Sequence, residues 1–204
     1  MDVIEALSSR RMVRSFASEA LAEEDVTELL ADALWAPTAG HSRGVRWIAL
    51  VGASELAAYF EAATDEAWRK GAARAPGLRR AAAAGVCVAQ PERYVERYAA
   101  PDKETSGLGA GAPSWPVPYW VGDAGAATMA ALLLAEERGI AAGFLGSFRR
   151  TSELGALLGL APSEIIYGTL LLGVAGDDDR RSSSLDRPGL SRAQRVQRLA
   201  APQA

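Results

Sequence analysis

One stretch of this chain, residues 123–138, is apolar on almost every side of the helix that it would form. Such a helix has no wide polar stripe to turn toward water, so the core or a second subunit has to cover it from several directions. Its uninterrupted apolar part ends at Glu136 and Glu137, short of the ~20 residues that cross a membrane. We therefore expect a protein that buries this helix and does not associate with a membrane.

The rest of the chain supplies enough apolar material for that burial. With 204 residues and 49% hydrophobic residues, the chain is long enough for one domain, residues 1–204, without a metal or disulfide staple. Cys87 is the single cysteine and His41 the single histidine, which excludes a disulfide framework and a Cys/His zinc site. The acidic residues after Met1 do not resemble an export signal, so we expect a cytoplasmic location.

The charge balance argues against nucleic acid as a partner. The chain has 22 Lys and Arg residues against 25 Asp and Glu residues, a formal net charge of −3. Its field as a whole therefore does not match a polyanion. Any anion must be bound by a local group of cations.

Hydrophobic periodicity predicts a chain of alternating helices and strands. We expect helices over 23–35, 54–73, 123–138 and 151–158, and strands over 45–51, 82–89 and 165–174, with a short glycine-punctuated piece over 140–148. The proline- and glycine-rich segment 90–118 is expected to be an irregular lid or surface excursion. Residues 177–204 are expected to form a polar tail in which Asp177, Asp178 and Asp179 make a solvated turn.

Few residues in this sequence suggest chemistry by themselves. Arg10, Arg11 and Arg14 could bind a phosphate through their guanidinium groups, or they could be a solvated face. Cys87 lies between two valines and is interpreted as an inert strand residue, and Asp123 as the N-cap or first-turn acid of its helix. The Gly107–Gly111 stretch lacks a Rossmann spacing, and neither a P-loop nor a nucleophile elbow occurs in the sequence.

Taken together, several motifs in their order resemble the FMN-dependent nitroreductases. The first half contributes Ser8-Ser9-Arg10-Arg11-Met12-Val13-Arg14-Ser15-Phe16, the helix ending in Ala36-Pro37-Thr38-Ala39-Gly40-His41, and the strand with Arg46-Trp47. The second half contributes Pro118-Tyr119-Trp120-Val121-Gly122-Asp123, the Gly143-Phe144-Leu145-Gly146 turn and the strand over 165–174. The resemblance covers roughly residues 4–52 and 117–198 and leaves the middle unmatched.

This resemblance implies an α+β fold with a mixed central sheet wrapped by helices, in an intertwined homodimer with one FMN at each interface. It places Arg10, Arg11, Met12 and Arg14 at the cofactor, with Arg187 of the tail near the phosphate. It also implies contacts to the flavin of the other subunit from the loop that contains Pro37, Thr38, Ala39 and His41, and a turn over the flavin ring at Leu145 and Gly146.

The activity that the resemblance implies is transfer of a hydride from NAD(P)H through flavin N5 to a small acceptor such as a nitroaromatic or a quinone. Flavin carries that chemistry itself, so no catalytic side chain and no metal are expected. A guanidinium such as that of Arg14, held near the negative charge of reduced flavin, would favour reduction.

Two departures from the family pattern leave alternatives open. Met12 stands where the pattern has a serine, and His41-Ser42-Arg43-Gly44-Val45 stands where many members have Asn-x-Gln-Pro-Trp. His41 and Arg43 could replace the lost donors, favour a more anionic flavin-like cofactor, or accompany weakened binding. The alternative functions are a flavin-binding or flavin-sequestering protein with little turnover, and a deazaflavin-dependent relative.

Overall fold

The computed structural model describes residues 1–71, 76–147, 149–196 and 198. Its centre is a four-stranded sheet with the strand order β1-β2-β4-β3. The strands are β1 (Val45–Val51), β2 (Ala83–Ala89), β3 (Ala141–Gly146) and β4 (Ile165–Gly173). The strands predicted over 45–51, 82–89 and 165–174 are confirmed to within a residue.

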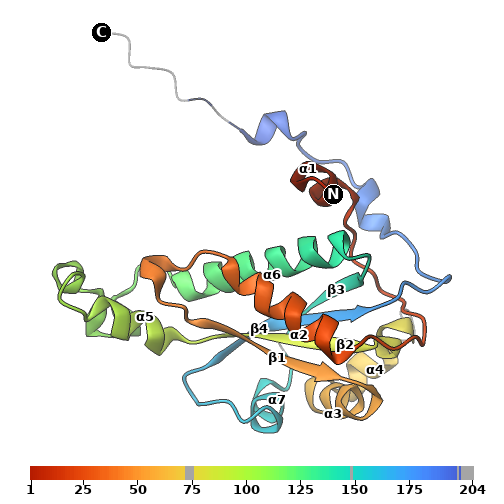
Figure 1. The fold of residues 1–204 in the computed structure, drawn as a ribbon, viewed down its shortest axis with the longest axis horizontal. Coiled ribbons are helices and arrows are strands. Elements are labelled where there is room, and N and C mark those ends of the chain that lie inside the picture. The colour runs from red at the N-terminus through yellow and green to blue at the C-terminus, as the bar shows by residue number, and fades with distance from the viewer. Residues whose placement is uncertain (72–75, 148, 197, 199–204) are drawn as a thin grey trace.

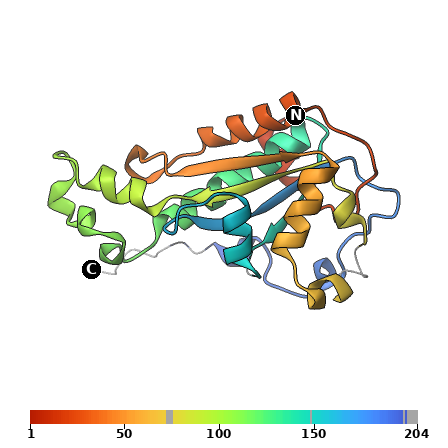
Figure 2. The ribbon, with the colours of Figure 1, turned by 90° about the horizontal axis from the view of Figure 1, so that it is seen from below.

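Helices cover both faces of this sheet (Figures 1 and 2). On one face, α2 (Glu23–Asp32) and α6 (Tyr119–Glu137) bury Leu29 and Ala131 against Leu170. On the other face, α3 (Ala53–Ala63) and α7 (Thr151–Leu157) pack on alternate residues of the same strands. The α+β class and the helix-wrapped sheet are thus confirmed. The described strand pairs are all antiparallel, so the parallel neighbour of a mixed sheet is not among them.

The helix expected over 54–73 is divided in two. Thr64 leaves the helical conformation, with φ −123°, at the end of α3, and α4 (Glu66–Gly71) begins two residues later. The Asp65 side chain accepts a hydrogen bond from the backbone N–H of Trp68 at 2.7 Å, as an N-cap residue does. The local cap therefore overrides the continuing apolar periodicity. Residues 72 and 73 of the expected helix lie outside the described residues.

The segment 90–118, called the excursion below, is more ordered than its composition indicated. It opens with α5 (Pro91–Tyr98), in which proline occupies the favourable first position. Three short 3₁₀ turns follow: η5 (Glu104–Ser106), η6 (Leu108–Ala110) and η7 (Ala112–Ser114). Tyr94 and Trp115 are both buried and their rings meet edge to face. These two aromatic residues, one near each end of the excursion, belong to a core cluster, so the segment is not irregular surface structure throughout. Its role as a lid stays a prediction.

Helix α6 begins at Tyr119, earlier than the sequence indicated. It buries one row of small residues toward the sheet, while α1 (Val3–Ser9) lies across part of its other side (Figure 1). In the part of the chain that the structure describes, no helix has the length and apolar character needed to cross a membrane.

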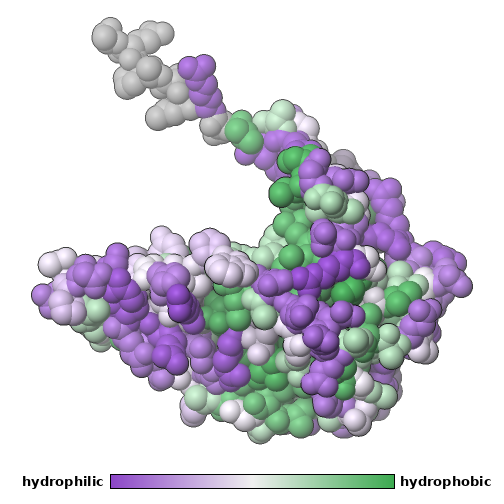
Figure 3. All heavy atoms as spheres, in the orientation of Figure 1, coloured by the Kyte–Doolittle hydropathy of each residue, from purple (hydrophilic) through white to green (hydrophobic). Residues whose placement is uncertain are grey.

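The described part of the tail, up to residue 196, extends away from the sheet (Figure 1). The tail carries η8 (Ser183–Asp186) and η9 (Ala193–Arg195), and it lies on the same side of the sheet as α1 in Figure 1. Hydrophobic side chains gather on α1 and the tail (Figure 3), and the exposed ones are Val3, Ile4, Leu7, Leu185 and Leu190. Residues 197 and 199–204 of the predicted tail lie outside the described residues.

Candidate functional site

Residues 10–16, called the arginine segment below, directly follow α1 and run along the outer edge of the sheet. Val13 is buried and donates its backbone N–H to the carbonyl of Ala142 on β3, at 2.9 Å. Arg14, the next residue, is exposed, because neighbours in an extended chain point to opposite sides. The sheet edge therefore fixes which arginines face outward.

Arg10 differs from the other arginines of this segment. Its side chain is half-buried, and its Nη1 atom is buried with no hydrogen-bond partner among the described residues. Buried guanidinium nitrogens are nearly always satisfied, because an unmade bond to a charged group is costly. The Arg10 guanidinium thus has a donor ready for an anionic ligand.

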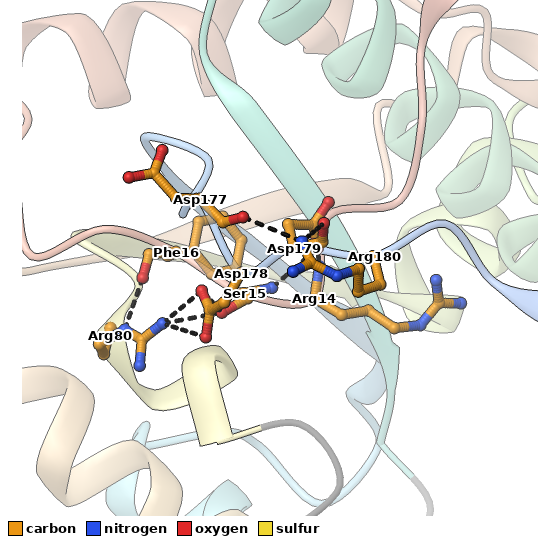
Figure 4. Close-up of polar contacts among 8 residues, drawn as sticks. All are labelled: Arg14, Ser15, Phe16, Arg80, Asp177, Asp178, Asp179 and Arg180. Carbon is orange, nitrogen blue, oxygen red and sulfur yellow. Dashed lines mark hydrogen bonds and ion pairs between the residues drawn. The ribbon is translucent and has the colours of Figure 1, made fainter.

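The turn after β4 holds the Arg11 side chain and the backbone at Arg14 and Ser15, of which Figure 4 shows the contacts at Arg14 and Ser15. Asp179, whose side chain is only 3% exposed, accepts hydrogen bonds from the backbone N–H groups of Arg14 at 2.8 Å and Ser15 at 3.1 Å. Its other oxygen pairs with Arg11 at 3.2 Å. The side chain of Arg14 points away from this network in Figure 4.

Asp178 forms the neighbouring contact of the same turn. It accepts from Ser15 Oγ at 2.6 Å and from Arg80, in η4 (Pro76–Arg80), at 2.9 Å. The hydrogen bond from Ser15, followed by that from Arg80, lowers the pKa of Asp178. The expected turn is present and its Asp177 and Asp178 are exposed, but the Asp179 side chain is buried and paired, so the turn is only partly solvated. Phe16 and Ala175 form an isolated antiparallel β-bridge, which brings two segments that are distant in sequence side by side. No local sequence pattern predicts that pairing.

The second group of candidate residues lies in the 37–44 loop. Two short turns, η1 (Ala33–Trp35) and η2 (Ala39–His41), lead from α2 through this loop toward β1. Gly40, His41 and Arg43 have φ values of 60°, 57° and 51°. For the two residues with a side chain, this left-handed conformation costs roughly 1–2 kcal/mol each. Contacts from outside the loop must therefore hold this strained conformation in place.

His41 and Arg43 contact each other within this loop. Arg43 Nε donates to His41 Nε2 at 2.9 Å, so this contact requires a neutral ring with its proton on Nδ1. The backbone N–H of Arg43 donates to Thr38 Oγ1 at 3.0 Å. The loop thus presents a guanidinium whose orientation is set by its own neighbours.

A cavity of about 540 Å³ opens beside the loop. It is lined by Ala31, Asp32, Leu34, Trp35, Ala36, Pro37, Thr38, His41, Arg43, Val45, Asp123 and Ala127. Trp35 is 88% exposed at this cavity, which is unusual for so large an apolar side chain. The sequence analysis did not single out Trp35, although a tryptophan next to the Ala-Pro pair was visible there.

Asp123 is the residue whose role the sequence analysis misjudged. Because α6 begins at Tyr119, Asp123 lies in the second turn of the helix and not at its N-cap. Its Oδ2 accepts from the backbone N–H of Ala39 at 2.7 Å and from the hydroxyl of Tyr94 at 2.8 Å. A lone acid in an otherwise apolar helical stretch was the signal in the sequence.

Leu145 and Gly146 lie at the end of β3, beside a second cavity of about 150 Å³ whose aromatic walls come from α3 and α4. Neither cavity has Arg10, Arg14 or Arg187 in its lining. Arg187 is exposed at the end of η8 in the tail. The single chain therefore keeps the expected cofactor residues in separate groups: the arginine segment, the 37–44 loop, the end of β3 and the tail.

Comparisons with known proteins identify the fold. The chain resembles a nitroreductase from Desulfovibrio desulfuricans solved in complex with FMN, with a TM-score of 0.64 and 18% identity over 94% of this chain and 98% of that one. Bacillus megaterium NfrA2 gives a TM-score of 0.70 and 20% identity over 98% of this chain and 76% of that one. The enone reductase CLA-ER of gut bacteria gives 0.68 and 15%, over 93% and 98%.

These likenesses show a shared fold. No curated protein matches the sequence. The model of the nitroreductase family, however, matches residues 7–174, a span that runs from α1 through the last strand of the sheet and includes both the arginine segment and the 37–44 loop. Since this match covers most of the chain, the protein belongs to the nitroreductase family.

Proposed function

We propose that this protein is an FMN-dependent oxidoreductase that takes hydride from NAD(P)H and reduces a small acceptor such as a nitroaromatic or a quinone. Bound FMN would supply the hydride chemistry, as flavins do in general. The observation that carries the proposal is the buried, unpartnered Nη1 of Arg10, in a segment that lies inside the family match.

The arginine segment suits the phosphate and ring of such a cofactor. The Arg10 guanidinium can give a phosphate two parallel hydrogen bonds. Arg14 Nη1 donates to the carbonyl of Met12 at 3.3 Å, and its side chain lies clear of the Asp178 and Asp179 carboxylates. Its positive charge is thus not cancelled by them, and a cation near the flavin ring would favour the reduced form.

Cys87 is not required for this reaction. Burial raises the pKa of the Cys87 thiol to about 12, so at neutral pH it is protonated and a poor nucleophile. Its sulfur lies 3.7 Å from the carbonyl of Ala124, within the core. This chain's own residues would therefore bind and orient reactants, which is what a flavin enzyme asks of its protein.

We further propose that the working form is a cytoplasmic homodimer. The separation of the arginine segment from the 37–44 loop supports a site completed by a second copy. The exposed apolar side chains of α1 and the tail support a large contact surface on the same side of the molecule. A monomer that retains stoichiometric FMN in sedimentation or light scattering would contradict the shared site.

Met12 supports a second candidate, a flavin-binding protein with little turnover. A methionine has no hydroxyl to donate to a cofactor. The Met12 side chain is half-buried and packs against the apolar cluster beneath α2 and α6. Steady-state NAD(P)H oxidation by the flavin-saturated protein separates the two functions. Turnover supports the oxidoreductase, and stoichiometric binding without turnover supports the alternative.

The deciding experiment is to identify the cofactor and measure its affinity. Absorbance and mass of the molecule released on denaturation distinguish FMN from a deazaflavin. Titration with FMN and with riboflavin then tests the phosphate assignment, since only FMN can use Arg10. Preference for FMN supports the proposal, and equal affinity for the two flavins contradicts it.

A further inference from the structure

We infer that Asp123 is a positioning residue that couples the excursion to the 37–44 loop, so that both keep one arrangement at the cofactor. The inference rests on the proposed function where it speaks of cofactor binding. Its structural part, the coupling itself, stands on contacts among described residues.

The carboxylate of Asp123 joins three parts of the chain through one atom. From its place in α6, Oδ2 accepts from Ala39 N in the loop at 2.7 Å and from Tyr94 Oη in α5 at 2.8 Å. Ala39 is 84 residues away in sequence and Tyr94 is 29 residues away. Asp123 also lines the larger cavity, so a change in its position alters the wall of that cavity.

The Tyr94 hydroxyl is a dependable donor to Asp123. The tyrosine is buried, and burial together with the adjacent Asp123 carboxylate raises its pKa well above the ordinary value. The hydroxyl is therefore protonated at neutral pH. A buried donor with one strong acceptor holds its geometry, because losing that acceptor is costly.

Packing between α5 and the loop reinforces this link. Arg97 Nε donates to the carbonyl of Gly40 at 2.8 Å, and a Cβ at Gly40 would press on the ring of Tyr98. Gly44 lies so close to Tyr94 that a Cβ there would overlap the ring. Because of this close packing, a shift of α5 would displace the loop as well.

The strained backbone of the loop needs a contact from outside to hold it. Gly40, His41 and Arg43 all have positive φ, and such conformations persist where the surroundings hold them. Asp123 supplies the contact at Ala39, the residue directly before this strained run. Without it, the loop would relax and the His41 and Arg43 side chains would leave their present orientation.

The test compares four variants of the full-length protein with and without FMN. Asp123→Ala removes the acceptor, and Tyr94→Phe removes one donor while keeping the ring. Asp123→Asn keeps an oxygen that can accept both bonds and should rescue the position. Thr128→Val is the matched control, because Thr128 is buried on the same helix and its hydroxyl bonds within the helix, to the carbonyl of Ala124 at 2.8 Å.

The first readout is hydrogen exchange of the backbone amides over 37–44 in the protein without added FMN. We expect exchange at Ala39 to accelerate about tenfold or more in Asp123→Ala and Tyr94→Phe, and to stay near wild type in Asp123→Asn and Thr128→Val. Unchanged exchange in both Asp123→Ala and Tyr94→Phe, or the same acceleration in Thr128→Val, would overturn the coupling. If Asp123→Ala fails to fold, Tyr94→Phe decides.

The second readout is the dissociation constant of FMN with the visible circular dichroism of the bound flavin. Both should change in Asp123→Ala, by about tenfold in affinity, and return toward wild type in Asp123→Asn. Faster loop exchange with unaltered flavin binding would overturn the positioning role at the cofactor while leaving the coupling intact. No flavin binding in the wild type would instead contradict the proposed function.

Discussion

The arginine segment and the 37–44 loop are fixed in the same way but from different surroundings. In each, one aspartate oxygen accepts two hydrogen bonds: Asp179 from two backbone N–H groups, and Asp123 from one backbone N–H and a tyrosine hydroxyl. Asp179 also pairs with Arg11, whereas the partners of Asp123 among the described residues are uncharged. The arginine segment lies extended along a sheet edge, and the loop carries left-handed residues.

The difference shows what each anchor has to do. At the arginine segment the carboxylate balances positive charge and sets the register of an unstrained chain. At the loop the carboxylate holds a conformation that the chain would otherwise leave. Four predictions test this distinction, in order of expected size.

Removing the Asp179 carboxylate should have the largest effect. Asp179→Ala leaves two backbone donors without their acceptor and Arg11 without its partner, so we expect a loss of about 3 kcal/mol in the free energy of unfolding. Asp178→Ala is the matched neighbour, and because its side chain is 54% exposed we expect a clearly smaller loss. Urea unfolding measures both, and equal losses would contradict the distinct role of Asp179.

Arg10→Ala should weaken FMN binding by about 1.5–3 kcal/mol, since it removes a bidentate contact to the phosphate. Arg11→Ala should weaken it less, because the Arg11 guanidinium is paired with Asp179. Titration with FMN measures the two variants, with riboflavin as the ligand that lacks the phosphate. A larger loss in Arg11→Ala would reverse the assignment of the two arginines.

Acid should loosen the contact among Arg46 of β1, Gln90 and Glu164. This contact lies next to the 37–44 loop, because Gln90 donates its backbone N–H to the carbonyl of Gly44 at 2.8 Å. The hydrogen bond from Arg46, together with contacts from Ala161 and Gln90, lowers the pKa of Glu164 to about 2 from the ordinary 4.5. A lowered folded-state pKa stabilises the fold above the unfolded-state value, and this stability is lost as the pH falls from 4.5 toward 2.

The expected loss over this interval is about 1–3 kcal/mol, reduced by the partial exposure of Arg46. Urea unfolding between these two pH values measures it. Glu164→Gln should flatten that part of the pH profile. A variant with the wild-type profile would remove Glu164 as its cause.

His41→Gly should have the smallest effect on stability, and an effect of the opposite sign. Glycine accepts a φ of 57° without a steric penalty, but it also makes the unfolded chain freer, which offsets part of that relief. We therefore expect the free energy of unfolding to rise by about 0.5 kcal/mol, as measured by thermal unfolding. The same change removes the ring that accepts from Arg43 and should weaken FMN binding. A variant that is destabilised would show that His41 is not strained.

The sequence was sufficient for elements with strong local patterns. The apolar runs around Val86 and Leu171 predicted strands, and the spacing of Val26, Leu29 and Leu30 predicted α2, because burial on one side leaves a periodic trace. Helix α5 was missed since the prolines and glycines around it dominate the composition. Its real signals were Pro91 at the first helical position and the i, i+4 pair Tyr94 and Tyr98.

The candidate site was only partly predictable. Arg10 and the 37–44 loop were chosen as candidate cofactor-binding residues by their resemblance to the nitroreductases. Their contact with a cofactor stays a prediction. The carboxylates that hold them did not follow from any pattern, because Asp179 meets Arg14 across 165 residues and Asp123 meets Ala39 across 84. Contacts over such separations depend on the finished fold, which local spacing does not encode.

The separation between Arg14 and Asp179 has a consequence for how the protein is made. During synthesis the arginine segment emerges early, and its carboxylate partner is added 165 residues later. At ribosomal rates of about 5–20 residues per second, this is a delay of roughly 10–30 s. Throughout that interval the nascent chain holds three clustered guanidinium groups without the acid that orders them. The arginine segment is therefore completed only near the end of translation, after the four described strands of the sheet have been made.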